Sequence, residues 1–245
     1  MHAVETSIAL EIPGTFNARV TATDSAGAPW LIRSAALDGV TEAGARRLQE
    51  LGVTTVIDLR EPLERQAPDA LGAGHPGRPA IRTQRVPLYQ LPDGPPATGS
   101  LREVYRFLLT ERRDRLALAV RSISEAPGVA LVHCAVGKDR TGLVTALTRL
   151  AAGDELPEIL EDYELSGAQM PAAHHDRVRA ALNSQGLDEE TLAASLAPHT
   201  QSPSDALADV LQELIIEHGS VEDYLRSRGL PEAALESLRQ KETGR

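Results

Sequence analysis

The chain has 245 residues, of which 42% are hydrophobic, and carries a formal net charge of −10. This length suits one domain with a full core, and the negative charge argues against nucleic acid or an anionic membrane as a partner. The single cysteine, Cys134, excludes an internal disulfide and favours a reducing compartment. We therefore expect a cytoplasmic protein. No signal peptide is expected, nor any apolar run of the roughly 18 residues that a membrane helix needs; export without a recognisable signal stays open.

Hydrophobic periodicity and turn residues predict alternating strands and helices over the first two thirds of the chain. Thr41 is a suitable N-cap for a helix that Gly52 ends, and the β-branched run that follows is typical of a buried strand. The prediction places strands at 30–32, 53–57, 81–88 and 129–132, helices at 41–51, 101–109, 116–126 and 141–152, and a loop at 89–100. This order indicates an α/β fold with a central, mostly parallel sheet flanked by helices.

Beyond Gly153 every pattern is helical. Apolar residues recur at helical spacing from Leu207 to Ile215, and shorter helical patterns follow to the end of the chain. We expect one domain over residues 1–245, whose C-terminal part, residues 154–245, is entirely helical.

Residues 133–142 read His-Cys-Ala-Val-Gly-Lys-Asp-Arg-Thr-Gly and join a predicted strand to a predicted helix. In parallel sheets, ligands bind at the carboxyl ends of strands, where this loop falls. Cys134 can supply a thiolate, since helix N-termini and nearby cations favour that form of cysteine. Arg140 supplies a planar fork for two phosphoryl oxygens. The spacing predicts a cysteine-dependent phosphatase.

The other loop residues have supporting roles in this prediction. A glycine inside the loop lets successive backbone N–H groups face one anion. Thr141 can donate its hydroxyl to the leaving sulfur, Lys138 can add positive charge at the mouth, and His133 can shape the loop from behind. The expected phosphate-binding residues are Ala135, Val136, Gly137, Lys138 and Thr141.

Two competing interpretations fit less well. A Walker loop needs Gly-x-x-x-x-Gly-Lys-Ser/Thr, but Val132 replaces its first glycine and Asp139 its hydroxyl residue. His174, His175 and Asp176 are a possible metal group, but adjacent histidines on a helix point in different directions. We therefore expect no metal site.

The string His-Cys-x-x-Gly-Lys-Asp-Arg-Thr-Gly resembles the signature of the bacterial and fungal tyrosine-specific and dual-specificity protein phosphatases. The similarity covers nearly the whole chain. Further matches are Asn17-Ala18-Arg19-Val20, Leu31-Ile32-Arg33-Ser34, Asp58-Leu59-Arg60 with Glu64, Asp162-Tyr163 with Ser166, and Gly219-Ser220 with Tyr224-Leu225-Arg226. The chain departs from the family at Val20, where an aspartate is usual, and at Gly167, where an asparagine is usual.

The resemblance implies the fold of the cysteine phosphatases and a two-step reaction through a cysteinyl-phosphate, with neither a metal nor an organic cofactor. It makes Cys134 the nucleophile and Arg140 the phosphate clamp, and it suggests that Asp58 and Arg60 brace the loop from behind. It also suggests a lid over the active site, formed within residues 167–218.

Two aspartates are candidates for the general acid. Asp93 stands where the family carries an aspartate on a loop near the active site, although Pro92-Asp93-Gly94 is also an ordinary turn sequence. Asp139 lies inside the cysteine loop and could donate the proton instead, or could bond to the loop backbone.

The expected substrate is phosphotyrosine, with phosphoserine and phosphothreonine as further candidates. Lys138 keeps a phosphoinositide substrate open, because extra positive charge suits an inositol head group. A rhodanese-type sulfurtransferase is disfavoured by Arg140 with Thr141. A phosphate-binding module without activity is disfavoured because Cys134 and Arg140 are both present. The sequence does not predict the oligomeric state.

Overall fold

The computed structural model describes residues 7–65, 71, 80–90, 100–183, 196 and 202–244. Within them, one sheet has the strand order β1-β2-β3-β6-β4-β5. The strands are β1 (Ile8–Ala9), β2 (Arg19–Thr23), β3 (Pro29–Ser34), β4 (Val53–Asp58), β5 (Arg82–Arg85) and β6 (Val129–His133). Strands β3, β6, β4 and β5 are parallel, whereas β1, β2 and β3 pair antiparallel. The mostly parallel sheet of the sequence prediction is confirmed.

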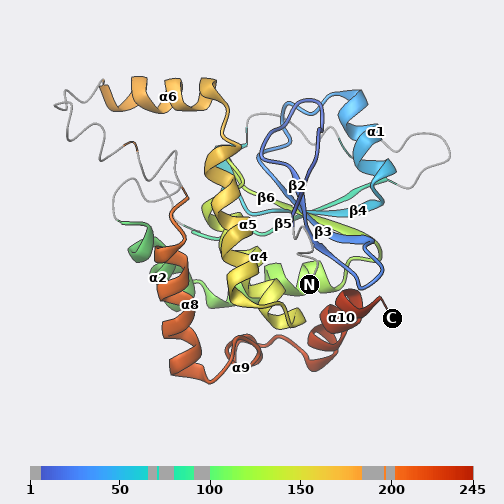
Figure 1. Cartoon of the computed structure of the whole chain (residues 1–245), viewed down its shortest axis with the longest axis vertical. Helices are drawn as coiled ribbons and strands as arrows, with labels where there is room; N and C mark the ends of the chain where they lie inside the picture. Colours follow the sequence, from blue (N-terminus) through green and yellow to red (C-terminus); the bar gives the residue numbers. More distant parts are fainter. Residues whose placement is uncertain are drawn as a thin grey trace.

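Helices cover both faces of this sheet (Figure 1). They are α1 (Glu42–Glu50), the 3₁₀ helix η1 (Pro62–Glu64), α2 (Leu101–Glu111), α3 (Arg113–Ser124), α4 (Asp139–Ala152), α5 (Leu156–Ala168), α6 (Ala172–Asn183), α8 (Asp205–His218), α9 (Val221–Arg226) and α10 (Glu232–Thr243). None of the helices in the described part of the chain has the length and apolar character to span a bilayer.

Alternating side chains of the central strands feed two separate cores. Leu31 and Ile57 pack with the helices α2 to α5 and α8 to α10, whereas their neighbours Ile32 and Val56 pack on the other face with Leu48 of α1. A strand that is buried on both faces reads as a continuous apolar run, which is why β4 and β6 were predictable.

Local signals explain the helix boundaries. The Thr41 side chain accepts a hydrogen bond from the Gly44 N–H at 3.2 Å, as an N-cap should, and Gly52 after α1 has φ +77°. Ser100 and Glu103 form a capping box at the start of α2.

The prediction was wrong in several places. It omitted β1 and β2, because β1 has two residues and β2 contains Arg19, a charged residue that is fully buried here. It made β5 too long, since four residues, Arg82–Arg85, form the strand. It also started α4 at Thr141, two residues after its first residue, Asp139.

Candidate active site

The cysteine loop, residues 134–138, lies at the carboxyl edge of the parallel strands. It connects β6 to α4, and in register His133 lies beside Ser34 of β3 and Asp58 of β4. Gly137 has φ +72°, and a Cβ there would lie 2.3 Å from the carbonyl oxygen of Ser34. Glycine is therefore required both for the backbone angle and for the close approach of the loop to β3.

Four consecutive carbonyl groups of the loop accept hydrogen bonds from outside it. The contacts are Ala36 N to Ala135 O (3.0 Å), Asn17 Nδ2 to Val136 O (2.9 Å) and Gly137 O (3.1 Å), and Arg33 Nη2 to Gly137 O (2.8 Å) and Lys138 O (3.2 Å). In a trans peptide the C=O and N–H point in opposite directions. The N–H groups of residues 136–139 therefore face the interior of the loop, next to the N-terminus of α4. Such an arrangement binds anions.

A buried carboxylate on α5 holds the arginines behind this loop. Asp162 accepts hydrogen bonds from Arg19 Nε at 2.8 Å and from Arg33 Nη1 at 2.6 Å. Arg19 also donates to Ser166 Oγ (2.9 Å) and to Asn17 Oδ1 (2.5 Å). Burial opposes ionisation of Asp162, but the two arginines outweigh it and hold the pKa of this carboxyl well below its usual range. The family-like motifs around these five residues thus build one buried network.

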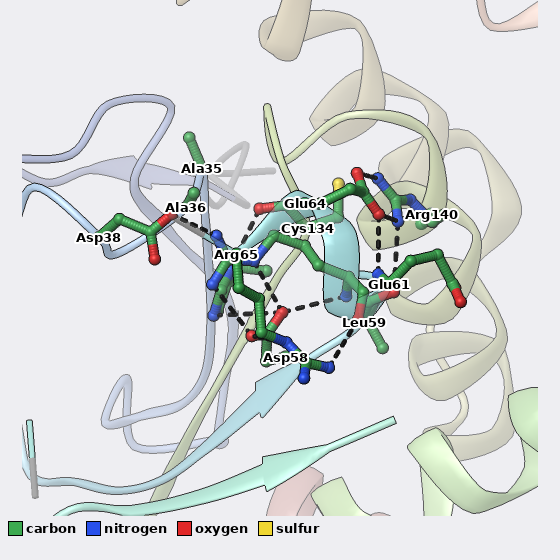
Figure 2. Close-up of polar contacts among 12 residues, drawn as sticks. Ala35, Ala36, Asp38, Asp58, Leu59, Glu61, Glu64, Arg65, Cys134 and Arg140 are labelled. Atoms are coloured by element: carbon green, nitrogen blue, oxygen red, sulfur yellow. Dashed lines mark hydrogen bonds and ion pairs between the residues drawn. The ribbon is translucent and has the colours of Figure 1, made fainter. Parts of the chain in front are cut away.

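A second polar group lies behind the cysteine, at the ends of β4 and β6 (Figure 2). Asp58 accepts hydrogen bonds from the backbone N–H, Nε and Nη2 of Arg60 at 2.9–3.0 Å. His133 is buried, with Nδ1 3.1 Å from the Cys134 carbonyl oxygen and Nε2 3.9 Å from Asp58. Burial lowers the pKa of His133 despite the opposing charge of Asp58, so the ring is neutral at pH 7. The three residues expected behind the loop therefore lie there together.

Cys134 lies at the base of the loop and is 2% exposed. The Arg140 guanidinium and the Tyr89 phenol both lie close enough for a charge on the Cys134 sulfur to act on them. A sulfur in this position is shielded from bulk solvent.

Arg140 is fixed by a bidentate ion pair with Glu64 of η1 (Figure 2). Nη1 and Nη2 each lie 2.6 Å from one oxygen of Glu64, and Nη1 also lies 3.3 Å from the Leu59 carbonyl oxygen. Burial opposes the charge of Arg140, but the bonds to Glu64 and the nearby Cys134 outweigh it and raise its pKa. Arginine has five N–H donors. Nε–H and the second Nη2–H have no acceptor in the described part of the chain, and these two form the fork that fits a pair of phosphoryl oxygens.

Asp139 is bound by two buried tyrosines rather than by the loop backbone. Tyr105 Oη lies 3.1 Å from Asp139 Oδ1, Tyr163 Oη lies 3.5 Å from it, and the two hydroxyls are 2.6 Å apart. Each phenol has one hydrogen, so the short contacts order the donors as Tyr163 to Tyr105 to Asp139. Burial raises the pKa of both tyrosines, which keeps them neutral donors.

The side chain of Lys138, which was expected at the mouth of the loop, is fully buried, with Nζ 3.5 Å from Asp139 Oδ1. Thr141 is also fully buried, and its Oγ1 has no hydrogen-bond partner among the described residues. Ala135 and Val136 are partly exposed. Asp93 lies outside the described residues.

Several residues that shape the site were not predicted as site residues. They are Asn17, Arg19, Arg33, Glu64, Tyr89, Tyr105, Asp162 and Tyr163. Most lie in or beside segments that match the family, but their partners are far away in the sequence. Of the residues that the structure describes, no three His, Cys, Asp or Glu side chains gather to hold a metal ion. The possible metal group His174, His175 and Asp176 lies on α6.

The chain is similar to known proteins over most of its length. The profile of the tyrosine phosphatase family matches residues 14–243. A tyrosine-protein phosphatase of Nostoc commune is 28% identical over 214 residues, which cover 85% of this chain and 72% of the relative. The triple specificity protein phosphatase PtpB of Mycobacterium tuberculosis is 28% identical over 276 residues, which cover 94% of this chain and 97% of the relative. The crystal structure of P. aeruginosa TpbA is 22% identical, with a TM-score of 0.37, over 80% of this chain and 99% of that one.

Proposed function

The chain belongs to the tyrosine phosphatase family and hydrolyses phosphotyrosine, and we propose that Cys134 is its nucleophile and Arg140 its phosphate clamp. The observation that carries this proposal is the convergence of three features on one small volume. These are the sulfur at the base of the loop, the inward N–H groups of residues 136–139, and the unoccupied fork of Arg140. Together they fit a tetrahedral dianion next to a nucleophile.

The reaction has two steps. The Cys134 thiolate attacks phosphorus, so that an S–P bond forms and the P–O bond to tyrosine breaks, while a general acid gives its proton to the leaving oxygen. Water then attacks phosphorus, the S–P bond breaks, and inorganic phosphate leaves while the conjugate base takes a proton from the water. Charge on the equatorial oxygens is stabilised throughout by the loop N–H groups and by Arg140.

We assign the general acid to Asp93. The alternative, Asp139, has one carboxyl oxygen that accepts a hydrogen bond from Tyr105 and lies 3.5 Å from Lys138 Nζ. These contacts hold the Asp139 side chain in place, which suits a positioning role. In this proposal Asp139 positions the loop, and the buried Lys138 lies beside it.

Phosphotyrosine is favoured over a phosphoinositide. The feature that supported the lipid was a lysine at the mouth of the loop, and the side chain of Lys138 is buried. The relative in Mycobacterium tuberculosis is named a triple specificity phosphatase, so phosphoserine and phosphothreonine belong in the same test. The experiment is a comparison of initial rates on peptides with each phosphoresidue and on a phosphoinositide, with Cys134→Ser as control. A phosphoinositide rate above the phosphotyrosine rate would overturn the preference.

We propose three further properties of the chain. Residues 154–245 belong to the same domain as the sheet, a lid forms within residues 167–218, and the protein is cytoplasmic. Described helices of the lid range are α6 and α8, and the His174 ring of α6 lies 6.3 Å from the Phe16 ring, next to the Asn17 that binds the loop. Limited proteolysis with and without vanadate tests the lid, because a closed lid should be protected by the bound anion.

A further inference from the structure

Tyr89 is fastened beside the active site by two charged side chains. It follows β5, and its N–H donates to Glu61 Oε1 at 2.9 Å, while its carbonyl oxygen accepts from Arg112 Nε at 2.5 Å. The next residue, Gln90, turns sharply at φ +50° and donates its N–H to the other oxygen of Glu61 at 3.2 Å. Glu61 is itself buried. Both polar groups of the Tyr89 backbone are therefore hydrogen-bonded to charged side chains.

The Tyr89 ring completes a closed set of contacts around Arg140, the proposed phosphate clamp. The Arg140 guanidinium lies over this ring, 5.0 Å from its centroid. Arg140 is paired with Glu64, Glu64 accepts the N–H of Glu61 at 2.8 Å, and Glu61 accepts the N–H of Tyr89. The position of the ring and the position of the guanidinium thus depend on each other.

The hydroxyl of Tyr89 has no hydrogen-bond partner in the described part of the chain, although the residue is 5% exposed. The charges that act on this phenol are those of Arg140, Asp139, Cys134 and Glu64, all members of the site. Burial, reinforced by the negative groups and opposed by Arg140, raises the pKa of Tyr89 above its ordinary value. The phenol therefore keeps its proton and is a neutral donor over the working pH range.

We propose that the Tyr89 hydroxyl donates a hydrogen bond to a phosphoryl oxygen of the substrate bound on the cysteine loop. The inference rests on the proposed function, because it gives an unpartnered donor beside the site the anion that the loop is built to hold. A neutral hydroxyl at this place can exchange water for a charged phosphoryl oxygen, and hydrogen bonds to charged groups are the stronger kind. No proton is transferred in this role, which leaves the general acid a separate residue.

The test compares wild type with Tyr89→Phe, which removes the hydroxyl and keeps the ring over Arg140. A hydrogen bond to a charged group is worth roughly a tenfold to hundredfold change in an equilibrium or rate constant. We expect kcat/KM for p-nitrophenyl phosphate to fall by that factor, equally at every assay pH, and inhibition by orthovanadate to weaken to a similar degree. The melting temperature should not fall. Tyr89→Leu, which also removes the ring, should lose more.

The matched control is Tyr224→Phe, because the Tyr224 hydroxyl bonds the Leu109 carbonyl at 2.9 Å in a buried place between α9 and α2. It should leave kcat/KM and vanadate inhibition unchanged. If wild type is active and Tyr89→Phe has the same kcat/KM and the same inhibition by vanadate, the inference is overturned, even if Tyr89→Leu is impaired. A wild type that turns over no phosphate ester would instead overturn the proposed function.

Discussion

Asp162 and Tyr163 are consecutive residues of α5, yet they hold the cysteine loop from two different sides. Asp162 binds Arg19 and Arg33, and Arg33 donates to the carbonyl groups of the loop. Tyr163 donates to Tyr105, which in turn donates to Asp139 at the start of α4. One turn of α5 therefore fixes both the backbone of the loop and the side chain of Asp139. Substitutions in this turn should lower catalytic activity although they do not contact the substrate.

Replacing Asp162 with Asn should strongly destabilise the fold. Two buried arginines would lose their carboxylate, and leaving a buried charge without its partner costs about 3–5 kcal/mol. Urea unfolding at pH 7 measures this loss. A smaller loss is expected for Ser166→Ala, which removes one hydrogen-bond partner of Arg19. Equal stabilities of Asp162→Asn and wild type would contradict the role of this network.

The same carboxylate should make stability depend on pH in the acid range. The pKa of Asp162 is depressed in the folded protein, so its contribution is fully present above the unfolded pKa of about 3.9 and is lost as the pH falls below it. Between neutral and acid pH, the free energy of unfolding should therefore fall more steeply for wild type than for Asp162→Asn. Parallel curves of unfolding free energy against pH for the two proteins would show that the pKa of Asp162 is not lowered by folding.

Glu64→Gln should reduce activity more than stability. The change keeps the shape of the side chain but removes the charge that holds both Nη atoms of Arg140. A misplaced guanidinium loses part of its stabilisation of the transition state, and we expect kcat to fall about tenfold to a hundredfold. The comparison variant is Arg140→Lys, which cannot bind two oxygens at once and should lose roughly a hundredfold or more. A fully active Arg140→Lys would refute the clamp.

Tyr105→Phe should break the chain of hydroxyls that ends on Asp139. The loss of a buried hydrogen bond should cost about 1–2 kcal/mol in stability, and the freed Asp139 should lower kcat. Tyr224→Phe is the control, since it removes a similarly buried hydroxyl far along the chain from the loop. Equal activities of the two variants would mean that the tyrosine pair does not position Asp139.

The two candidate acids differ in their pH–rate profiles. Asp93→Asn should remove the descending, basic limb of the profile and should slow substrates with poor leaving groups most. Asp139→Asn should lower the rate but keep that limb. The reverse result, a lost limb in Asp139→Asn alone, would transfer the role to Asp139.

The sequence predicted the elements that are apolar on both faces and the loop that they carry. The runs 53–57 and 129–132 were recognisable because strands buried on both faces have a continuous apolar sequence. Gly137 has the left-handed backbone angle that the turn of the cysteine loop needs. The motif at 133–142 thereby indicated where the candidate site lies.

The supporting residues were not predictable in the same way. Arg19 and Arg33 are charged residues in strands, and a pattern that treats charge as a sign of exposure misses their burial against Asp162, which lies 143 and 129 residues away. The contact of Tyr89 with Arg140 likewise joins segments that only the fold brings together. Such pairs leave no local periodicity in the chain.

The central claim is that a covalent phosphoryl group passes through Cys134. Acid quenching during turnover of a phosphotyrosine peptide, followed by peptide mass spectrometry, tests it directly. In wild type, the peptide that contains Cys134 should carry one phosphoryl group, and Cys134→Ser should show neither adduct nor turnover. Turnover by Cys134→Ser at the wild-type rate, or a phosphoryl group on another residue, would contradict it.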